Sequence, residues 1–194
     1  HLNRSSNESV MNCTNVELWF DEGTFEVREH DAANRFTNQV SAVYDPDSES
    51  PEWDKALKRL FRDTSDPEGM VRHLHEVMGY LVQSSRDLAA WVLFHGVGAN
   101  GKSMVTRVLQ HLMGPRASVS LDLAELGRDR HAAAGLVGKL MLLEDDFREG
   151  AKLPDGIMKK LSESKTLTAN PKYGQQFEFV SRASPVVLSN HWPQ

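Results

Sequence analysis

Residues 96–103 read Gly-Val-Gly-Ala-Asn-Gly-Lys-Ser, which matches the pattern G-x-x-x-x-G-K-[ST]. The preceding segment, residues 91–94, is apolar (Trp-Val-Leu-Phe), and residues 102–112 carry apolar side chains at helical spacing. A strand, a glycine-rich turn and a helix in this order form a concave nest of backbone N–H groups at the positive end of the helix dipole. The stretch therefore predicts a loop that holds the phosphates of a nucleoside triphosphate.

Each position of this loop has a predicted contact with ATP or with Mg²⁺. Lys102 is expected to reach the β- and γ-phosphates, and the Ser103 hydroxyl is expected to bind the metal ion. The other predicted nucleotide contacts are Gly96, Gly98, Ala99, Asn100, Gly101 and Met104. The alternative, a glycine turn with an incidental Lys-Ser pair, does not explain three glycines within six positions.

A second apolar run ends in carboxylates. Residues 140–143 (Leu-Met-Leu-Leu) are followed directly by Glu144, Asp145 and Asp146. Because ligands of open α/β sheets bind outside the carboxyl ends of the strands, these carboxylates are expected opposite the phosphate loop. Asp145 and Asp146 are the choices for orienting Mg²⁺ (Asp145) and for positioning the attacking water, with Glu144 as third candidate. The competing interpretation is a solvated acidic turn.

Apolar runs alternate with helical segments from about residue 88 onward. Strands are expected at 91–94, 140–143 and 186–188, and helices at 102–112 and 155–161. This alternation indicates a parallel sheet flanked by helices. We therefore predict an α/β P-loop domain over residues 87–194, preceded by a small, mostly helical module with a β-hairpin over residues 1–86.

The upstream module begins with β-rich sequence. Runs at 16–20 and 24–28 flank Asp-Glu-Gly at 21–23, which indicates a hairpin. Residues 36–44 are expected to form a third extended piece, and the composition of residues 45–51 is that of a linker.

Two helices are expected to follow. The first begins at Pro51 with Ser50 as its N-cap, and the second begins after Asp66-Pro67. Each has an apolar stripe that is expected to pack against the other helix or the next domain. The stripes are Trp53, Leu57, Leu60 and Phe61 in the first helix, and Val71, Leu74, Met78, Leu81 and Val82 in the second.

Composition narrows the classes of function. The net charge of −5 argues against a broad basic coat for nucleic acid, but not against a channel to which several subunits each contribute a few lysines. Cys13 is the only cysteine, so an internal disulfide and a cysteine zinc site are excluded and a reducing compartment is expected. The eight histidines lack metal-ligand spacing. No apolar run approaches the ~18 residues of a membrane span.

The motifs resemble those of a known family. GVGANGKS (96–103), LMLLEDDF (140–147), MKKLSESKTLTANPKYGQQFEF (158–179) and PVVLSN-HWP (185–193) follow the order of superfamily 3 helicases. The chain is similar above all to phage and plasmid primase-helicases and their poxvirus relatives. The block from about Asn15 to Gln83 also resembles the small domain that precedes the motor in those proteins. The resemblance implies an AAA+-like P-loop fold.

The resemblance also implies roles at single positions. Asp145 and Asp146 match the acidic pair of the second motif, although a shift of one residue would select Glu144 and Asp145. Asn190, after a strand, resembles the polar sensor that contacts the γ-phosphate or the attacking water. An asparagine at a strand end is otherwise a common turn residue.

Residues 166–179 resemble the segment that carries a DNA-contacting hairpin. Its Pro-Lys-Tyr-Gly sequence offers a turn, a cation and an aromatic ring, so Lys165, Lys172 and Tyr173 are the candidate DNA contacts. The alternative is a solvated hairpin with ordinary surface lysines. The chain departs from the family at Glu163 and Ser164, where glycines are common, and at Asn170, where arginine is frequent.

By resemblance, the protein is an ATP-dependent DNA helicase of replication that forms a hexameric ring around one DNA strand. An upstream primase domain in the same polypeptide and a place in the bacterial host cytoplasm, with no membrane attachment, are expected. The family's arginine finger would lie beyond Gln194, so this stretch alone is expected to have little ATPase activity. Two alternatives remain: a P-loop small-molecule kinase, for which only Arg128 and Arg130 suggest a lid, and a non-hydrolysing nucleotide-gated assembly module.

Overall fold

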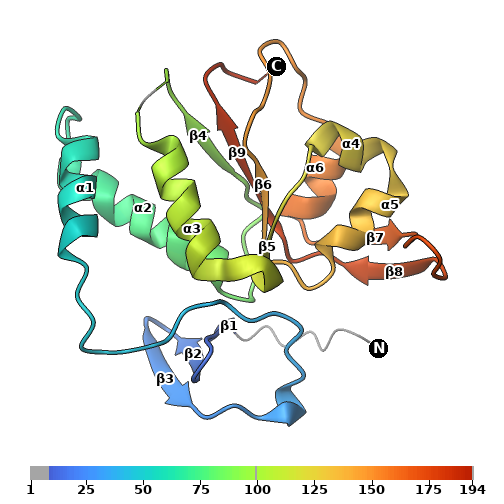
Figure 1. Ribbon diagram of the computed structural model, residues 1–194, viewed down its shortest axis with the longest axis horizontal. Coiled ribbons are helices and arrows are strands. Elements are labelled where there is room, and N and C mark those ends of the chain that lie inside the picture. The colour runs from blue at the N-terminus through green and yellow to red at the C-terminus, as the bar shows by residue number, and fades with distance from the viewer. Residues whose placement is uncertain (1–8, 99, 194) are drawn as a thin grey trace.

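The computed structural model describes residues 9–98 and 100–193, and their strands form three sheets (Figure 1). The strands are β1 (Ser9–Asn12), β2 (Glu17–Asp21), β3 (Thr24–Arg28), β4 (Val92–His95), β5 (Ser118–Ser120), β6 (Met141–Glu144), β7 (Thr166–Ala169), β8 (Phe177–Val180) and β9 (Ser184–Ser189). The helices are α1 (Pro51–Phe61), α2 (Pro67–Val82), α3 (Lys102–Ala117), α4 (Leu123–Arg128), α5 (Arg130–Ala133) and α6 (Asp155–Ser162), with 3-10 turns η1 (Ala32–Asn34) and η2 (Ala134–Leu136). No helix in these ranges is long and apolar enough to cross a membrane.

The central sheet has the strand order β4-β9-β6-β5, and each neighbouring pair is parallel. The predicted parallel α/β fold is therefore confirmed. β9 lies between β4 and β6, so the strand before the glycine-rich loop and the strand before the carboxylates are both its neighbours. The carboxyl ends of these strands consequently meet at one edge of the sheet.

Alternate residues of the central strands enter two separate cores. Leu143 and Val186 pack in the cluster with α1, α2 and α3, whereas Leu142 and Val187 pack in the cluster with α4 and α6. Figure 1 shows α3 on one side of the sheet and α4 and α6 on the other. The sequences of these strands are continuous apolar runs because helices cover both faces of the sheet. Each fully buried aliphatic side chain contributes about 1.5–3 kcal/mol.

The N-terminal sheet contains the predicted hairpin, since β2 and β3 are antiparallel neighbours. Its third strand is β1, which precedes the hairpin and pairs with β2. Residues 36–44, which were expected to form a third extended piece, do not form a strand. The amide of Val40 donates to Asn12 O at 2.9 Å and that of Ser41 to Leu112 O at 2.9 Å, so the segment joins two elements instead of forming a ladder with one.

Both predicted helix starts are confirmed, but the caps differ. Ser50 occupies the N-cap position of α1, yet its side chain makes no capping hydrogen bond, so its predicted capping role is wrong. Asp66 caps α2, and its carboxylate accepts from the Gly69 amide at 2.9 Å. The stripes of the two helices share one core with α3, in which Leu57 and Leu81 are fully buried.

Hydrogen bonds from Arg86 connect the end of α2 to the central sheet. Its guanidinium donates to Leu81 O (3.1 Å) in α2, to Leu140 O (2.9 Å) beside β6, and to Arg182 O (2.7 Å) before β9. Burial lowers the pKa of Arg86 to about 10. These contacts join the predicted module to the predicted P-loop domain, and the boundary at residue 86 stays a prediction.

Candidate nucleotide site

The glycine-rich loop connects the end of β4 to the start of α3. Gly101, at the N-cap of α3, has φ 82° in the left-handed region. A Cβ atom at this position would lie 2.6 Å from Cδ1 of Leu60 in α1. The left-handed backbone conformation is what favours glycine at this position.

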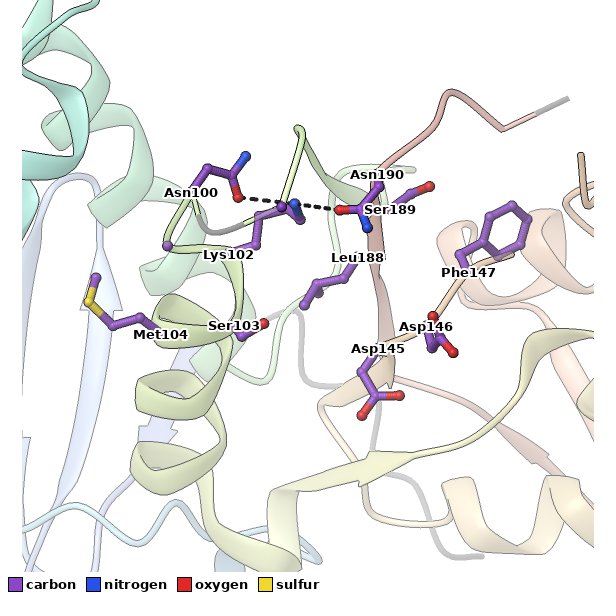
Figure 2. A pocket seen from close by; sticks show the side chains of 12 residues that line it. Asn100, Lys102, Ser103, Met104, Asp145, Asp146, Phe147, Leu188, Ser189 and Asn190 are labelled. Atoms are coloured by element: carbon purple, nitrogen blue, oxygen red, sulfur yellow. Dashed lines mark hydrogen bonds between the residues drawn. The ribbon is translucent and has the colours of Figure 1, made fainter. Parts of the chain in front are cut away.

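Lys102 is held by oxygen atoms from three directions. Its ammonium donates to Gly96 O, to Asn100 Oδ1 at 3.0 Å and to Asn190 Oδ1 at 3.0 Å (Figure 2). The first two acceptors belong to the loop, and the third belongs to the end of β9. The ammonium is thus positioned between the loop and the neighbouring strand.

The acidic segment continues alongside β9 after β6 has ended. The amide of Phe147 donates to Leu188 O at 3.2 Å, which keeps this stretch against the last residues of β9. Asp145 and Asp146 are exposed and face the same pocket as the loop. Figure 2 shows Lys102 and Ser103 on one side of this pocket and both aspartates on the other.

Glu144 is turned away from the loop. Its Oε2 atom accepts a hydrogen bond from the Leu123 amide at 2.8 Å, at the start of α4. Burial raises the pKa of Glu144, and the Leu123 amide opposes that shift. The geometry therefore favours Asp145 and Asp146 as the acidic pair and gives Glu144 a positioning role for α4.

Most of the predicted site residues line one pocket of about 300 Å³. The predicted residues that line it are Gly98, Asn100, Gly101, Lys102, Ser103, Met104, Asp145, Asp146 and Asn190. Gly96 contributes its carbonyl oxygen to Lys102, and Ala99 lies outside the described residues. Arg128 and Arg130, considered for a kinase lid, do not line the pocket.

Sequence reasoning missed three lining residues, Phe147, Leu188 and Ser189. Their only signal was adjacency to predicted positions. Ser189 positions Asn190, because its hydroxyl oxygen accepts from the His191 amide at 3.1 Å and its O–H donates to His191 O at 2.5 Å. This turn closes directly after β9 and presents Asn190 to Lys102.

The donors in the pocket fit Mg²⁺. This ion is typically held by one or two carboxylates, phosphate oxygens and water, rather than by an all-protein cage. Asp145, Asp146 and the exposed Ser103 hydroxyl supply such oxygens on opposite walls. Among the described residues, no group of three or more His, Cys, Asp or Glu side chains is arranged to hold a metal ion.

The candidate DNA contacts lie at two ends of a β-hairpin. β7 and β8 pair antiparallel, and the Gly174 amide donates to Pro171 O at 3.1 Å to form the predicted turn. Lys172 and Tyr173 are exposed at this tip. Lys165 precedes β7 at the opposite end and forms an ion pair with Glu163. The structure thus groups Lys172 with Tyr173 and separates both from Lys165.

Two family models match the chain. The one described as "Family of unknown function (DUF5906)" matches residues 94–194, and the one described as "D5 N terminal like" matches residues 5–62. A search of the curated proteins gave no match.

Solved structures resemble the chain in fold. One A-form apo structure of the NrS-1 C-terminal region has a TM-score of 0.60 at 19% identity, covering 89% of this chain and 40% of its own. A second has a TM-score of 0.56 at 18% identity, covering 90% and 39%. A JCV helicase structure is less similar, with a TM-score of 0.46 at 17% identity over 71% of this chain and 39% of its own, and supports no inference. The chain spans about two fifths of the NrS-1 structures, and the likeness shows the fold alone.

Proposed function

Because this chain belongs to the family of unknown function DUF5906 and has a superfamily 3 helicase domain of the primase-helicase kind, we propose that it forms the ATP-driven motor of a replicative DNA helicase. One observation carries the proposal. The ammonium of Lys102, the carboxylates of Asp145 and Asp146 and the amide of Asn190 line a single pocket at the carboxyl edge of the sheet.

The loop and Lys102 bind the triphosphate. Backbone N–H groups before α3 and the dipole of that helix favour the anionic phosphates. Lys102 exchanges its three protein acceptors for β- and γ-phosphate oxygens, since these carry full negative charge. Asn190, released from Lys102, is then free to contact the γ-phosphate.

The opposite wall provides the groups for hydrolysis. Ser103 and Asp145 hold Mg²⁺, which neutralises charge that develops on the phosphates. Asp146 accepts a hydrogen bond from the attacking water and orients it toward the γ-phosphate. The carboxylates face the pocket and are solvent-exposed, so water reaches them directly.

The hairpin of β7 and β8 contacts single-stranded DNA. At its tip, Lys172 supplies a cation for a phosphate and Tyr173 supplies a ring for a base. The net charge of −5 is compatible with DNA binding in a channel to which several subunits contribute such tips, as in a hexameric ring. A primase domain in the same polypeptide belongs to this proposal.

The deciding experiment is an ATPase assay of the full protein with and without single-stranded DNA. We expect Mg²⁺-dependent hydrolysis that single-stranded DNA stimulates, and loss of hydrolysis in Asp146→Asn. Phosphate transfer to a small acceptor would instead identify a kinase. Tight ATP binding with no turnover under any condition would identify an assembly module.

A further inference from the structure

We infer that α1 and the segment before it hold the phosphate loop in its binding conformation, with Leu60 as the positioning residue. Both elements lie within residues 5–62, the stretch matched by the D5 N terminal like family model. The inference rests on the proposed function, since it concerns how the loop binds phosphates. It is carried by two contacts with α3, one at each end of that helix.

The first contact joins Leu60 to Gly101. The three atoms nearest to a Cβ atom placed at Gly101 all belong to the Leu60 side chain, so this side chain lies directly against the Gly101 main chain. Gly101 is the N-cap of α3, and its carbonyl oxygen accepts a helical hydrogen bond from the Val105 amide at 3.1 Å. Lys102 and Ser103, the first two residues of α3, therefore follow directly from a position that Leu60 supports.

Leu60 supports the loop without facing the ligand. It does not line the phosphate pocket, whose walls include Gly101, Lys102 and Ser103. Its side chain is partly buried and packs against the hydrophobic core shared by α1, α2 and α3. Leu60 can therefore influence phosphate binding only through the position of the loop.

The second contact joins Ser41 to the other end of α3. The Ser41 amide donates to Leu112 O at 2.9 Å, and a Cβ atom at Gly114 would overlap the Ser41 side chain. Gly114, with φ 67°, kinks α3 at this point. Figure 1 shows the chain before α1 passing this end of α3. Ser41 and Leu60 thus hold the two ends of one helix, and both belong to the matched stretch.

Support of this kind makes phosphate binding more favourable. A glycine-rich loop has many accessible backbone conformations, and its N–H groups bind an anion only when they converge. A contact that keeps Gly101 in place means that less conformational freedom is lost when the phosphates bind. Because linkage is reciprocal, bound phosphates must in turn stabilise the contact between α1 and the loop.

The test compares matched truncations in the full protein, with Mg²⁺-tripolyphosphate as the ligand because it has the phosphates but no base. Leu60→Ala removes the methyl groups that lie against Gly101. Val71→Ala, at a partly buried position of α2, removes apolar contact from the same core. Leu60→Met restores an apolar side chain of similar size and is the rescue variant. Titration calorimetry measures the affinities, and thermal unfolding measures the stabilities.

We expect Leu60→Ala to weaken tripolyphosphate binding by on the order of fivefold or more, the lower end of the usual coupling between two sites. Val71→Ala should lower stability but bind as wild type does, and Leu60→Met should recover the affinity. Wild-type affinity in Leu60→Ala, or an equal loss in both truncations, would overturn the positioning role and leave the phosphate site standing. Failure of wild type to bind tripolyphosphate would overturn the proposed function, and the positioning role with it.

Hydrogen exchange on the wild-type protein tests the same inference without a substitution and decides it if Leu60→Ala does not fold. Saturating tripolyphosphate should slow the exchange of the α1 amides, because it stabilises the loop against which α1 packs. β3, which pairs with β2 alone among the described strands, is the control within the same matched stretch, and its exchange should not change. Unchanged exchange in α1, or equal slowing in α1 and β3, would overturn the inference.

Discussion

The Nζ atom of Lys102 lies 3.0 Å from Oδ1 of Asn190, so the residue expected to bind the phosphates and the residue expected to sense them are hydrogen-bonded to each other. Lys102 is the first residue of α3 and Asn190 directly follows β9, and the two residues are 88 positions apart in the sequence. Binding of a triphosphate has to replace this contact. The amide oxygen of Asn190 therefore takes the place on Lys102 that a phosphate oxygen of the ligand would occupy.

Lys102→Ala should abolish measurable ATP binding without unfolding the protein. The ammonium makes charge-assisted bonds of about 1.5–3 kcal/mol each, and a triphosphate offers it more than one acceptor, so a loss of 100-fold or more is expected. Titration calorimetry measures the affinity, and thermal unfolding checks the fold. Lys55→Ala, on the exposed surface of α1, is the control. Wild-type affinity in Lys102→Ala would remove the basis for the site.

Asn190→Ala should separate ATP from ADP. A sensor that contacts the γ-phosphate contributes to ATP binding alone, so ATP affinity should fall about tenfold while ADP affinity stays constant. Asn190→Asp should weaken ATP binding further, because its carboxylate would neutralise Lys102 and repel the γ-phosphate. An equal loss for ATP and ADP would show that Asn190 has no such selective contact.

Glu144→Gln should change how stability depends on pH. Burial raises the pKa of Glu144 above its ordinary value of 4.5, so the folded protein holds this proton more tightly than the unfolded chain does. The stabilising contribution is complete at pH values below 4.5 and is lost as pH rises through the folded pKa. The glutamine variant still accepts from the Leu123 amide but has no charge to desolvate. The free energy of unfolding of the variant, measured by urea titration, should increase relative to that of wild type as the pH rises from about 4 to about 8. A difference that is constant across this range would contradict the assignment.

Lys172→Ala should weaken the binding of single-stranded DNA by the full protein and reduce the salt dependence of that binding. Each lost phosphate contact lowers the slope of log K against log salt by about 0.7 for single strands. Lys165→Ala, at the other end of the hairpin and already paired with Glu163, should change the slope less. Equal slopes for wild type and Lys172→Ala, measured by fluorescence anisotropy, would exclude the tip as a DNA contact.

Arg86→Lys should destabilise the fold without altering the affinity for tripolyphosphate. A lysine carries its three donors on a single atom and cannot donate to the carbonyl oxygens of α2, Leu140 and Arg182 at the same time. Some of these buried acceptors would therefore lose their hydrogen bonds. Each unsatisfied group costs about 1–3 kcal/mol. Urea titration should show the loss; an unchanged midpoint would mean that water replaces the guanidinium.

The parts of the fold that could be predicted from the sequence are those with a strong local signal. β4, β6 and β9 are apolar runs, and α1 and α2 begin at proline after a polar residue. β1 and β5 escaped prediction because Ser9–Asn12 and Ser118–Ser120 are short and polar at their ends. No helix was predicted over residues 123–136, which form α4, α5 and η2, although Arg128 and Arg130 were considered for a kinase lid.

In the candidate site, too, the parts that could be predicted are those with a strong local signal in the sequence. The loop and the aspartates follow from motif and strand position, and the pocket brings them together. The direction of Glu144 was not predictable, because it depends on the Leu123 amide, contributed by a helix whose existence the sequence did not indicate.

The central place of β9 has a consequence for how the protein folds. Val92 of β4 pairs with Val186, and Leu143 of β6 pairs with the same residue from the other side. β6 also pairs with β5, which precedes it, but β4 pairs with no described strand other than β9, so β4 joins these strands only after β9 has been synthesised. Such non-local pairing slows folding, because the entropy of closing a long loop is lost before the contacts form. On the ribosome, the nucleotide-binding edge consequently assembles late, and the nascent chain keeps the apolar strand β4 unpaired until β9 is made.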